Sequence, residues 1–160
     1  RAVGQTGRVR PLRPGVSVAH VDVTAGTLGG FVTVDGRLHA LSNHHVLVGS
    51  PAAREGDPVL QPGPADGGRD PQDRVGALAG FVPLEAGTTA LVDAAVASLQ
   101  EEEVDLGYPS APLTGTATVA GGETVEKIGR TTGTTQGRVT AFELDDVVVG
   151  YGPEVGDVSF

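Results

Sequence analysis

A two-residue Asp35-Gly36 turn between two apolar runs is the feature that most constrains the fold of this chain. The turn separates the run at residues 31–34 from a second run at residues 37–42. An Asp-Gly dipeptide in this setting is a strong signal for a β-hairpin, because both residues tolerate the positive φ angles of a tight hairpin turn. The chain is therefore expected to fold back on itself here.

The composition extends this expectation to the whole chain. Gly 25 and Pro 11 among 160 residues, with Val and Thr recurring throughout, are typical of many short strands joined by turns. We therefore expect an all-β fold. A chain of this length buries roughly 70% of its unfolded surface, which is enough for one good core or two small ones.

The charge and the apolar runs narrow the classes of partner. A net charge of -9 and a pI near 4.7 disfavour nucleic acid and anionic membranes, because both would repel the chain. No apolar run approaches ~18 residues, so we expect no membrane-spanning helix. With no cysteine, the chain has neither a disulfide framework nor a thiolate zinc site.

Two adjacent histidines follow the second hairpin strand. Asn43, His44 and His45 come where that strand ends and a short helical turn is expected, and three apolar residues follow. Such a junction places side chains between a rigid scaffold and open surface. An imidazole held there can act as a general base near neutral pH.

Three features follow one another in this region: Gly-Gly-Phe-Val, the hairpin, and Leu-Ser-Asn-His-His-Val-Leu. Together they resemble the segment that carries the catalytic histidine in trypsin-like serine peptidases, particularly bacterial ones without a disulfide beside it. In that family a small or hydroxyl residue, two variable positions, the histidine and an apolar residue follow one another. Matched in this way from Ser42 to Val46, the resemblance implies that His45 is the catalytic histidine. His44 falls on a variable position and is expected to be an exposed neighbour.

Asp93 is the second chemical candidate, because it lies between Leu, Val and Ala in the apolar run at residues 90–99. A buried, unpaired carboxylate costs several kcal/mol or takes up a proton, so Asp93 should have a hydrogen-bond partner, and an imidazole is the obvious one. In trypsin-like peptidases the aspartate begins a similar strand about fifty residues after the histidine; Asp93 follows His45 by forty-eight. An aspartate that caps a turn or helix remains the alternative.

The chain divides into four parts in this interpretation. Residues 1–14 form a basic arm that lies over the fold, and residues 15–100 form a first β-barrel. Six strands are expected there, at about 15–23, 27–34, 37–42, 58–61, 74–82 and 90–99, and closing such a sheet removes its exposed edges. Gly76 and Gly80 are expected to mark bends or a bulge in a curved sheet.

An acidic, proline-bearing connector at residues 101–112 leads to residues 113–160, where strands are expected at 113–120, 124–128, 147–151 and 155–160. This part contains the string Lys-Ile-Gly-Arg-Thr-Thr-Gly, followed by Gly-Arg-Val-Thr. The two strings resemble the first hairpin of the second barrel in bacterial trypsin-like peptidases. The resemblance as a whole implies chymotrypsin-like antiparallel β-barrels, the first complete and the second partial.

The resemblance also implies a nucleophile that these residues do not provide. In this family the serine lies in a Gly-Asp-Ser-Gly turn, which does not occur in residues 1–160. The nearest string, at residues 156–159, places a valine before Ser159, and no glycine turn surrounds the other serines, which are Ser17, Ser42, Ser50, Ser98 and Ser110. The segment alone is therefore expected to be inactive.

Two explanations of the missing serine are open. In the first, which we favour, the chain is the amino-terminal piece of a peptidase that cleaves polypeptide substrates, and the remainder of the protease or a complementing chain completes it. In the second, the chain is a protease-like binding module without activity. The presence of both His45 and Asp93 weighs against the second explanation, because a binding module needs neither residue. Neither the chemistry nor the resemblance implies a metal or an organic cofactor.

Other features carry weaker signals. Asp66, Asp70 and Asp73 do not have the spacing of a calcium loop, so no metal is expected there. His20 is expected on a solvent-facing side of its strand. A β-sandwich that binds a carbohydrate or a protein is a third hypothesis, although two Tyr and four Phe supply few exposed aromatics for it. The distance from His45 Nδ1 to the Asp93 carboxylate discriminates between the sandwich and the peptidase.

Overall fold

The computed structural model describes residues 5–100, 104–108 and 111–160, and these residues form an all-β protein with almost no helix. Every pairing between its strands is antiparallel. This confirms the expected all-β class, whereas the chymotrypsin-like barrels, the first complete and the second partial, stay a prediction. Parts of the expected arm (1–4) and connector (101–103 and 109–110) lie outside the described residues, and the four-part division of the chain stays a prediction.

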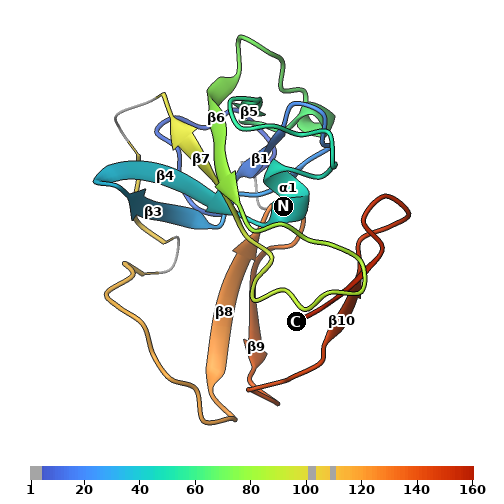
Figure 1. Cartoon of the computed structure of the whole chain (residues 1–160). Helices are drawn as coiled ribbons and strands as arrows, with labels where there is room; N and C mark the ends of the chain where they lie inside the picture. The colour runs from blue at the N-terminus through green and yellow to red at the C-terminus, as the bar shows by residue number, and fades with distance from the viewer. Residues whose placement is uncertain (1–4, 101–103, 109–110) are drawn as a thin grey trace.

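The largest sheet curls into a half-barrel with the strand order β2-β1-β5-β6-β7-β4-β3 (Figure 1). Its strands are β1 (Ser17–His20), β2 (Gly26–Thr27), β3 (Gly30–Val34), β4 (Arg37–Ser42), β5 (Pro58–Leu60), β6 (Arg74–Phe81) and β7 (Ala95–Leu99). The predicted hairpin is present, because β3 pairs with β4 across Asp35 and Gly36, whose φ angles are 48° and 76°.

The two edge strands of this sheet are consecutive in the chain. Between β2 and β3 lie only Leu28, whose N–H donates to Val16 O (2.8 Å), and Gly29, whose N–H donates to Leu41 O (2.9 Å). The chain therefore passes from one edge of the sheet to the other. A register shift in β6 between Leu78 and Gly80 adds to the curvature, as expected for a bulge near Gly80.

A single apolar core fills the concave side of the curled sheet. It combines valines and alanines of the strands with Val46 and Leu47 of α1 (His44–Leu47), a single helical turn. Leu12 of the arm also lies in this core and is 1% exposed. Burial of these side chains is the main stabilising term for the first part of the chain, and it fixes α1 against the sheet.

The second part of the chain forms two separate hairpins. The first consists of β8 (Thr124–Gly129) and β9 (Gly133–Arg138), and the second of β10 (Val148–Gly150) and β11 (Asp157–Ser159). The strand expected at 113–120 is absent: residues 111–123 contain no strand and run as a long loop below the sheet (Figure 1). All of residues 113–120 are exposed, and no described strand pairs with them, so their backbone has no sheet partner there.

The β8–β9 hairpin is attached to the first sheet through Arg130. Its guanidinium forms an ion pair with Asp66 in the short turn η1 (Pro64–Asp66), and its backbone N–H donates to Thr27 Oγ1 (2.9 Å). The Asp66 side chain is only 7% exposed, and the hydrogen bonds from Arg130 hold its pKa below the ordinary value. Because a planar guanidinium binds a carboxylate with two parallel hydrogen bonds, this pair fixes orientation as well as position.

The three aspartates whose spacing does not fit a calcium loop have other partners. Asp66 pairs with Arg130, Asp70 pairs with Arg74 at 2.7 Å, and Asp73 accepts the Arg69 N–H at 3.0 Å. In the part of the chain that the structure describes, no group of three or more His, Cys, Asp or Glu side chains has metal-binding geometry.

His20 differs from its expectation, because it is buried and only 2% exposed. All four residues of β1 are buried, and the strand lies between β2 and β5 in the sheet. Nδ1 of His20 accepts the Asp22 N–H (3.1 Å), so Nε2 carries the proton and donates it to Asp57 (3.1 Å). Alternating polarity predicted a strand with one exposed face, but both faces of β1 are buried.

Only short helices occur in the described ranges, and none of them has both the length and the apolar character to cross a lipid bilayer.

Candidate active site

The helical turn after β4 points the side chains of the two adjacent histidines in different directions. Asn43 has an extended backbone (φ -71°, ψ 154°) and begins α1, so that successive side chains point in different directions. The His45 side chain is 56% exposed, whereas His44 is only 6% exposed. The expectation that His44 is an exposed neighbour was therefore wrong: a helical turn that buries Val46 and Leu47 also turns His44 inward.

His45 and Asp93 meet through a hydrogen bond. Nδ1 of His45 lies 2.9 Å from Oδ2 of Asp93, whose side chain is 15% exposed. An ionised carboxylate can only accept, so Nδ1 carries the proton and the lone pair of Nε2 is free. Nε2 makes no hydrogen bond within the described residues. The ring is thus oriented with its basic nitrogen toward solvent.

The backbone of the histidine turn also holds Asp93. The His44 N–H donates to Oδ1 (2.5 Å), and the Asn43 side-chain amide donates to the Asp93 carbonyl (3.1 Å). Asp93 lies just before β7, which is shorter than the expected strand at 90–99. The apolar neighbours that suggested burial, Leu91 and Val92, are themselves 96% and 46% exposed. Asp93 is shielded by long-range partners rather than by these neighbours.

Tyr151 is a third member of this group that sequence reasoning missed. Its hydroxyl donates to Asp93 Oδ2 (2.9 Å), and its ring centroid lies 6.2 Å from that of His45. Burial, with the hydrogen bond and the charge of Asp93, raises the pKa of Tyr151 to about 12. The only signal in the sequence is an isolated aromatic residue between two glycines, which does not indicate a partner.

The β10–β11 hairpin brings Tyr151 to the His45–Asp93 pair, called the dyad below. It does so by pairing with the segment before Asp93. The Ala90 N–H donates to Ser159 O (2.8 Å), and the Ser159 N–H donates to Thr88 O (3.2 Å). A small apolar cluster of Leu84, Ala90 and Val158 supports this contact, and the Tyr151 ring packs against it. The site is therefore built from residues that come before the long loop at 111–123 in the sequence and from residues that follow it.

The described serines do not complete a triad. Four of the hydroxyls bond to the backbone, where Ser42 and Ser98 donate to carbonyls and Ser17 and Ser50 accept N–H groups. Ser159 lies in β11, and no described serine hydroxyl bonds to His45. Ser110 lies outside the described residues. The catalytic roles of His45 and Asp93 remain predictions.

Comparison with known proteins adds no relative to this picture: no protein-family model matches the chain, and no curated protein matches it significantly.

Replacing Tyr151 with Phe is expected to remove a pH-dependent part of the stability. In the folded protein the hydroxyl has a pKa of about 12, compared with 10.0 ordinarily. Its contribution to stability is therefore fully present below pH 10 and is lost as the pH rises toward 12. At pH 7, Tyr151→Phe should cost about 1–2 kcal/mol, because it removes a partly exposed hydrogen bond to a charged group.

Urea denaturation at pH 7 and pH 11, together with titration of phenolate absorbance, tests this expectation. The chain has two tyrosines, so the difference between wild type and Tyr151→Phe isolates the titration of Tyr151. Tyr108→Phe is the matched control, because it removes a hydroxyl that accepts the Ile128 N–H at 2.9 Å and does not touch Asp93. A difference curve centred near pH 10 would contradict the contact with Asp93.

Proposed function

We propose that this chain is part of a serine endopeptidase of trypsin-like type that hydrolyses peptide bonds with a Ser-His-Asp triad. The observation that supports the proposal is the 2.9 Å hydrogen bond between His45 Nδ1 and Asp93 Oδ2, with the opposite ring nitrogen facing solvent. This contact favours the peptidase over the β-sandwich, for which the two residues have no reason to meet. The curled sheet is compatible with a complete first barrel, and the two hairpins with a partial second barrel.

The geometry suits His45 to move a proton. With Nδ1–H directed at Asp93, Nε2 can accept the proton of a serine hydroxyl as the oxygen attacks a peptide carbonyl. The positive charge that develops on the ring is stabilised by the carboxylate 2.9 Å away. His45 then returns the proton to the leaving amine, and the same cycle with water releases the acyl group.

The role of Asp93 in this proposal is orientation. Its two oxygens accept three hydrogen bonds, from His44 N–H, Tyr151 O–H and His45 Nδ1–H. Two donors from the histidine turn and one from the β10–β11 hairpin leave the carboxylate little freedom to rotate. His45 is consequently held in a single tautomer, which a general base in this position requires.

The proposal needs a serine and oxyanion-binding N–H groups from a polypeptide segment other than residues 1–160. That segment is the remainder of the same protease or a complementing chain. The substrate is a polypeptide, and the cleavage-site preference depends on pocket walls that this segment would contribute.

Fluorophosphonate labelling tests the proposal, because the reagent reacts with a serine only when a neighbouring base activates it. The full reading frame should be labelled and should cleave casein, whereas residues 1–160 alone should not react. His45→Ala in the full protein should abolish both signals. An unlabelled full protein that still binds peptides would instead favour the inactive binding module, and labelling that survives His45→Ala would exclude the proposed triad.

A further inference from the structure

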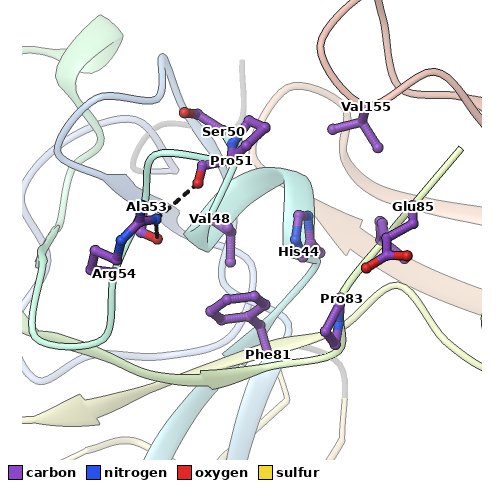
Figure 2. Close-up of a pocket in the computed structure, with 11 residues that line it drawn as sticks. His44, Val48, Ser50, Pro51, Ala53, Arg54, Phe81, Pro83, Glu85 and Val155 are labelled. Atoms are coloured by element: carbon purple, nitrogen blue, oxygen red, sulfur yellow. Dashed lines mark hydrogen bonds between the residues drawn. The ribbon is translucent and has the colours of Figure 1, made fainter.

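A pocket of about 280 Å³ lies beside the dyad on the side of His44. Figure 2 shows it between three walls: the loop after α1 with Pro51 and Ala53, the chain around Phe81 and Pro83, and Val155 opposite. The uncharged polar side chains of the walls belong to His44 and Ser50, and the Ser50 hydroxyl already accepts the Ala52 N–H at 3.0 Å. Charged groups occur only on the exposed residues Arg54 and Glu85.

His44 is the unusual group in this pocket. Its side chain is more than nine-tenths buried, yet neither ring nitrogen bonds to any residue in the described part of the chain. The backbone N–H of His44 is used by Asp93, and the ring contacts the Phe81 ring edge-on, with centroids 5.6 Å apart. The ring nitrogens are not sealed from solvent, so they are available for a hydrogen bond to a molecule that occupies the pocket.

The charges around the pocket favour a neutral occupant. Burial lowers the pKa of His44, an effect that the charge of Asp93 opposes and that of His45 reinforces. A neutral ring offers one donor and one acceptor. Nη1 of Arg54 donates to Pro51 O and Ala53 O of its own loop, both at 2.8 Å. Arg54 and Glu85 are both exposed and carry opposite charges at the rim, so the pocket favours neither an anion nor a cation.

We propose that this pocket binds one uncharged aromatic ring that carries a hydroxyl group. A hydroxyl both donates and accepts, so it satisfies a neutral imidazole in either tautomer. Phe81 and the two prolines present flat apolar surfaces that suit the faces and edges of an aromatic ring. A dry cavity of ~150 Å³ holds benzene, so about 280 Å³ accommodates one substituted ring rather than a larger ligand.

This assignment is independent of the proposed peptidase activity, because it uses no group that moves a proton there. A phenolic ring can come from a small molecule or from a tyrosine side chain. Both sources share the same chemistry, and the experiment separates them.

The test titrates the folded chain with phenol, toluene and cyclohexanol and follows the backbone amide resonances by NMR. Phenol should bind saturably, with a Kd on the order of 1 mM, as is usual for so few atoms. Toluene and cyclohexanol should bind at least about fivefold more weakly, because each lacks either the hydrogen bond or the flat ring. N-acetyltyrosinamide binding with the same resonance changes would indicate a peptide source, and phenol binding alone a small molecule.

Three variants decide the result. His44→Phe keeps a flat ring and removes the hydrogen bond, so it should weaken phenol binding about 5–10-fold and leave toluene within about twofold. Val155→Phe narrows the mouth and should abolish binding of both probes; it remains informative if His44→Phe fails to fold. Val147→Phe enlarges a 40% exposed valine of the same hairpin outside the pocket and should change neither affinity.

Equal affinity for phenol and toluene in the wild type would overturn the proposal, as would absence of saturable phenol binding. A His44→Phe variant that weakens both probes equally, or a Val147→Phe variant that acts like Val155→Phe, would overturn it as well.

Discussion

Asp93→Asn is expected to lower the rate of fluorophosphonate labelling of the full protein by about 10⁴-fold, with the fold retained. An asparagine has one acceptor oxygen, and the fixed His44 N–H requires it at the position of Oδ1, whereas the Tyr151 hydroxyl at the position of Oδ2 can turn and accept instead. Its amide group then faces His45 as a donor, so Nδ1 must accept and the ring proton moves to Nε2. Nε2 can no longer take the proton of a serine.

Asp57→Asn is the matched control for this variant. Asp57 also bonds to a histidine, His20, at 3.1 Å, but neither residue contacts the dyad. The rate in Asp57→Asn should stay within about a factor of three of the wild type. If both variants lose activity equally, or if Asp93→Asn keeps the wild-type rate, the proposed role of Asp93 is wrong.

Leu47→Ala is expected to destabilise the protein by about 3–4 kcal/mol, a larger effect on folding than that of Tyr151→Phe. Leu47 is fully buried at the end of α1, and it packs in the core cluster beneath the sheet. Removal of three carbons leaves a cavity that the surrounding strands cannot fill. Because α1 carries His45, the same variant should also loosen the hydrogen bond to Asp93.

Urea denaturation followed by circular dichroism measures this effect as a lower midpoint with an unchanged slope. Leu91→Ala provides a matched leucine, since Leu91 is 96% exposed and lies two residues before Asp93. Its substitution should change the free energy of unfolding by no more than about 0.5 kcal/mol. Similar losses in the two variants would show that α1 is not anchored by its buried face.

Local signals in the sequence predicted the local structure well. The Asp35-Gly36 turn and β4 at Arg37–Ser42 agree with expectation, because turn chemistry and strand pattern act over a few neighbouring residues. The prediction of a strand at 113–120 was wrong for the opposite reason. Its pattern suits a strand, but a strand needs a partner, and a sequence pattern does not say whether one is available.

The candidate site was only partly predictable. His45 and Asp93 were found through a resemblance, and the structure places them in contact. The inward turn of His44 depends on how α1 packs, and the approach of Tyr151 depends on how the second hairpin docks; both are tertiary effects without a local signal. The apolar neighbours of Asp93 pointed to the right residue for a reason that the structure does not support, since two of them are exposed.

The hydrogen-bond donors to Asp93 are synthesised at different times. The histidine turn is translated 48 residues before the carboxylate, but the tyrosine that binds the same oxygen follows 58 residues later. Domains form from the amino terminus while synthesis continues. A nascent polypeptide that has folded its first sheet therefore still leaves one side of Asp93 open to water. The ribosome must deliver the second hairpin before this carboxylate acquires its full set of partners.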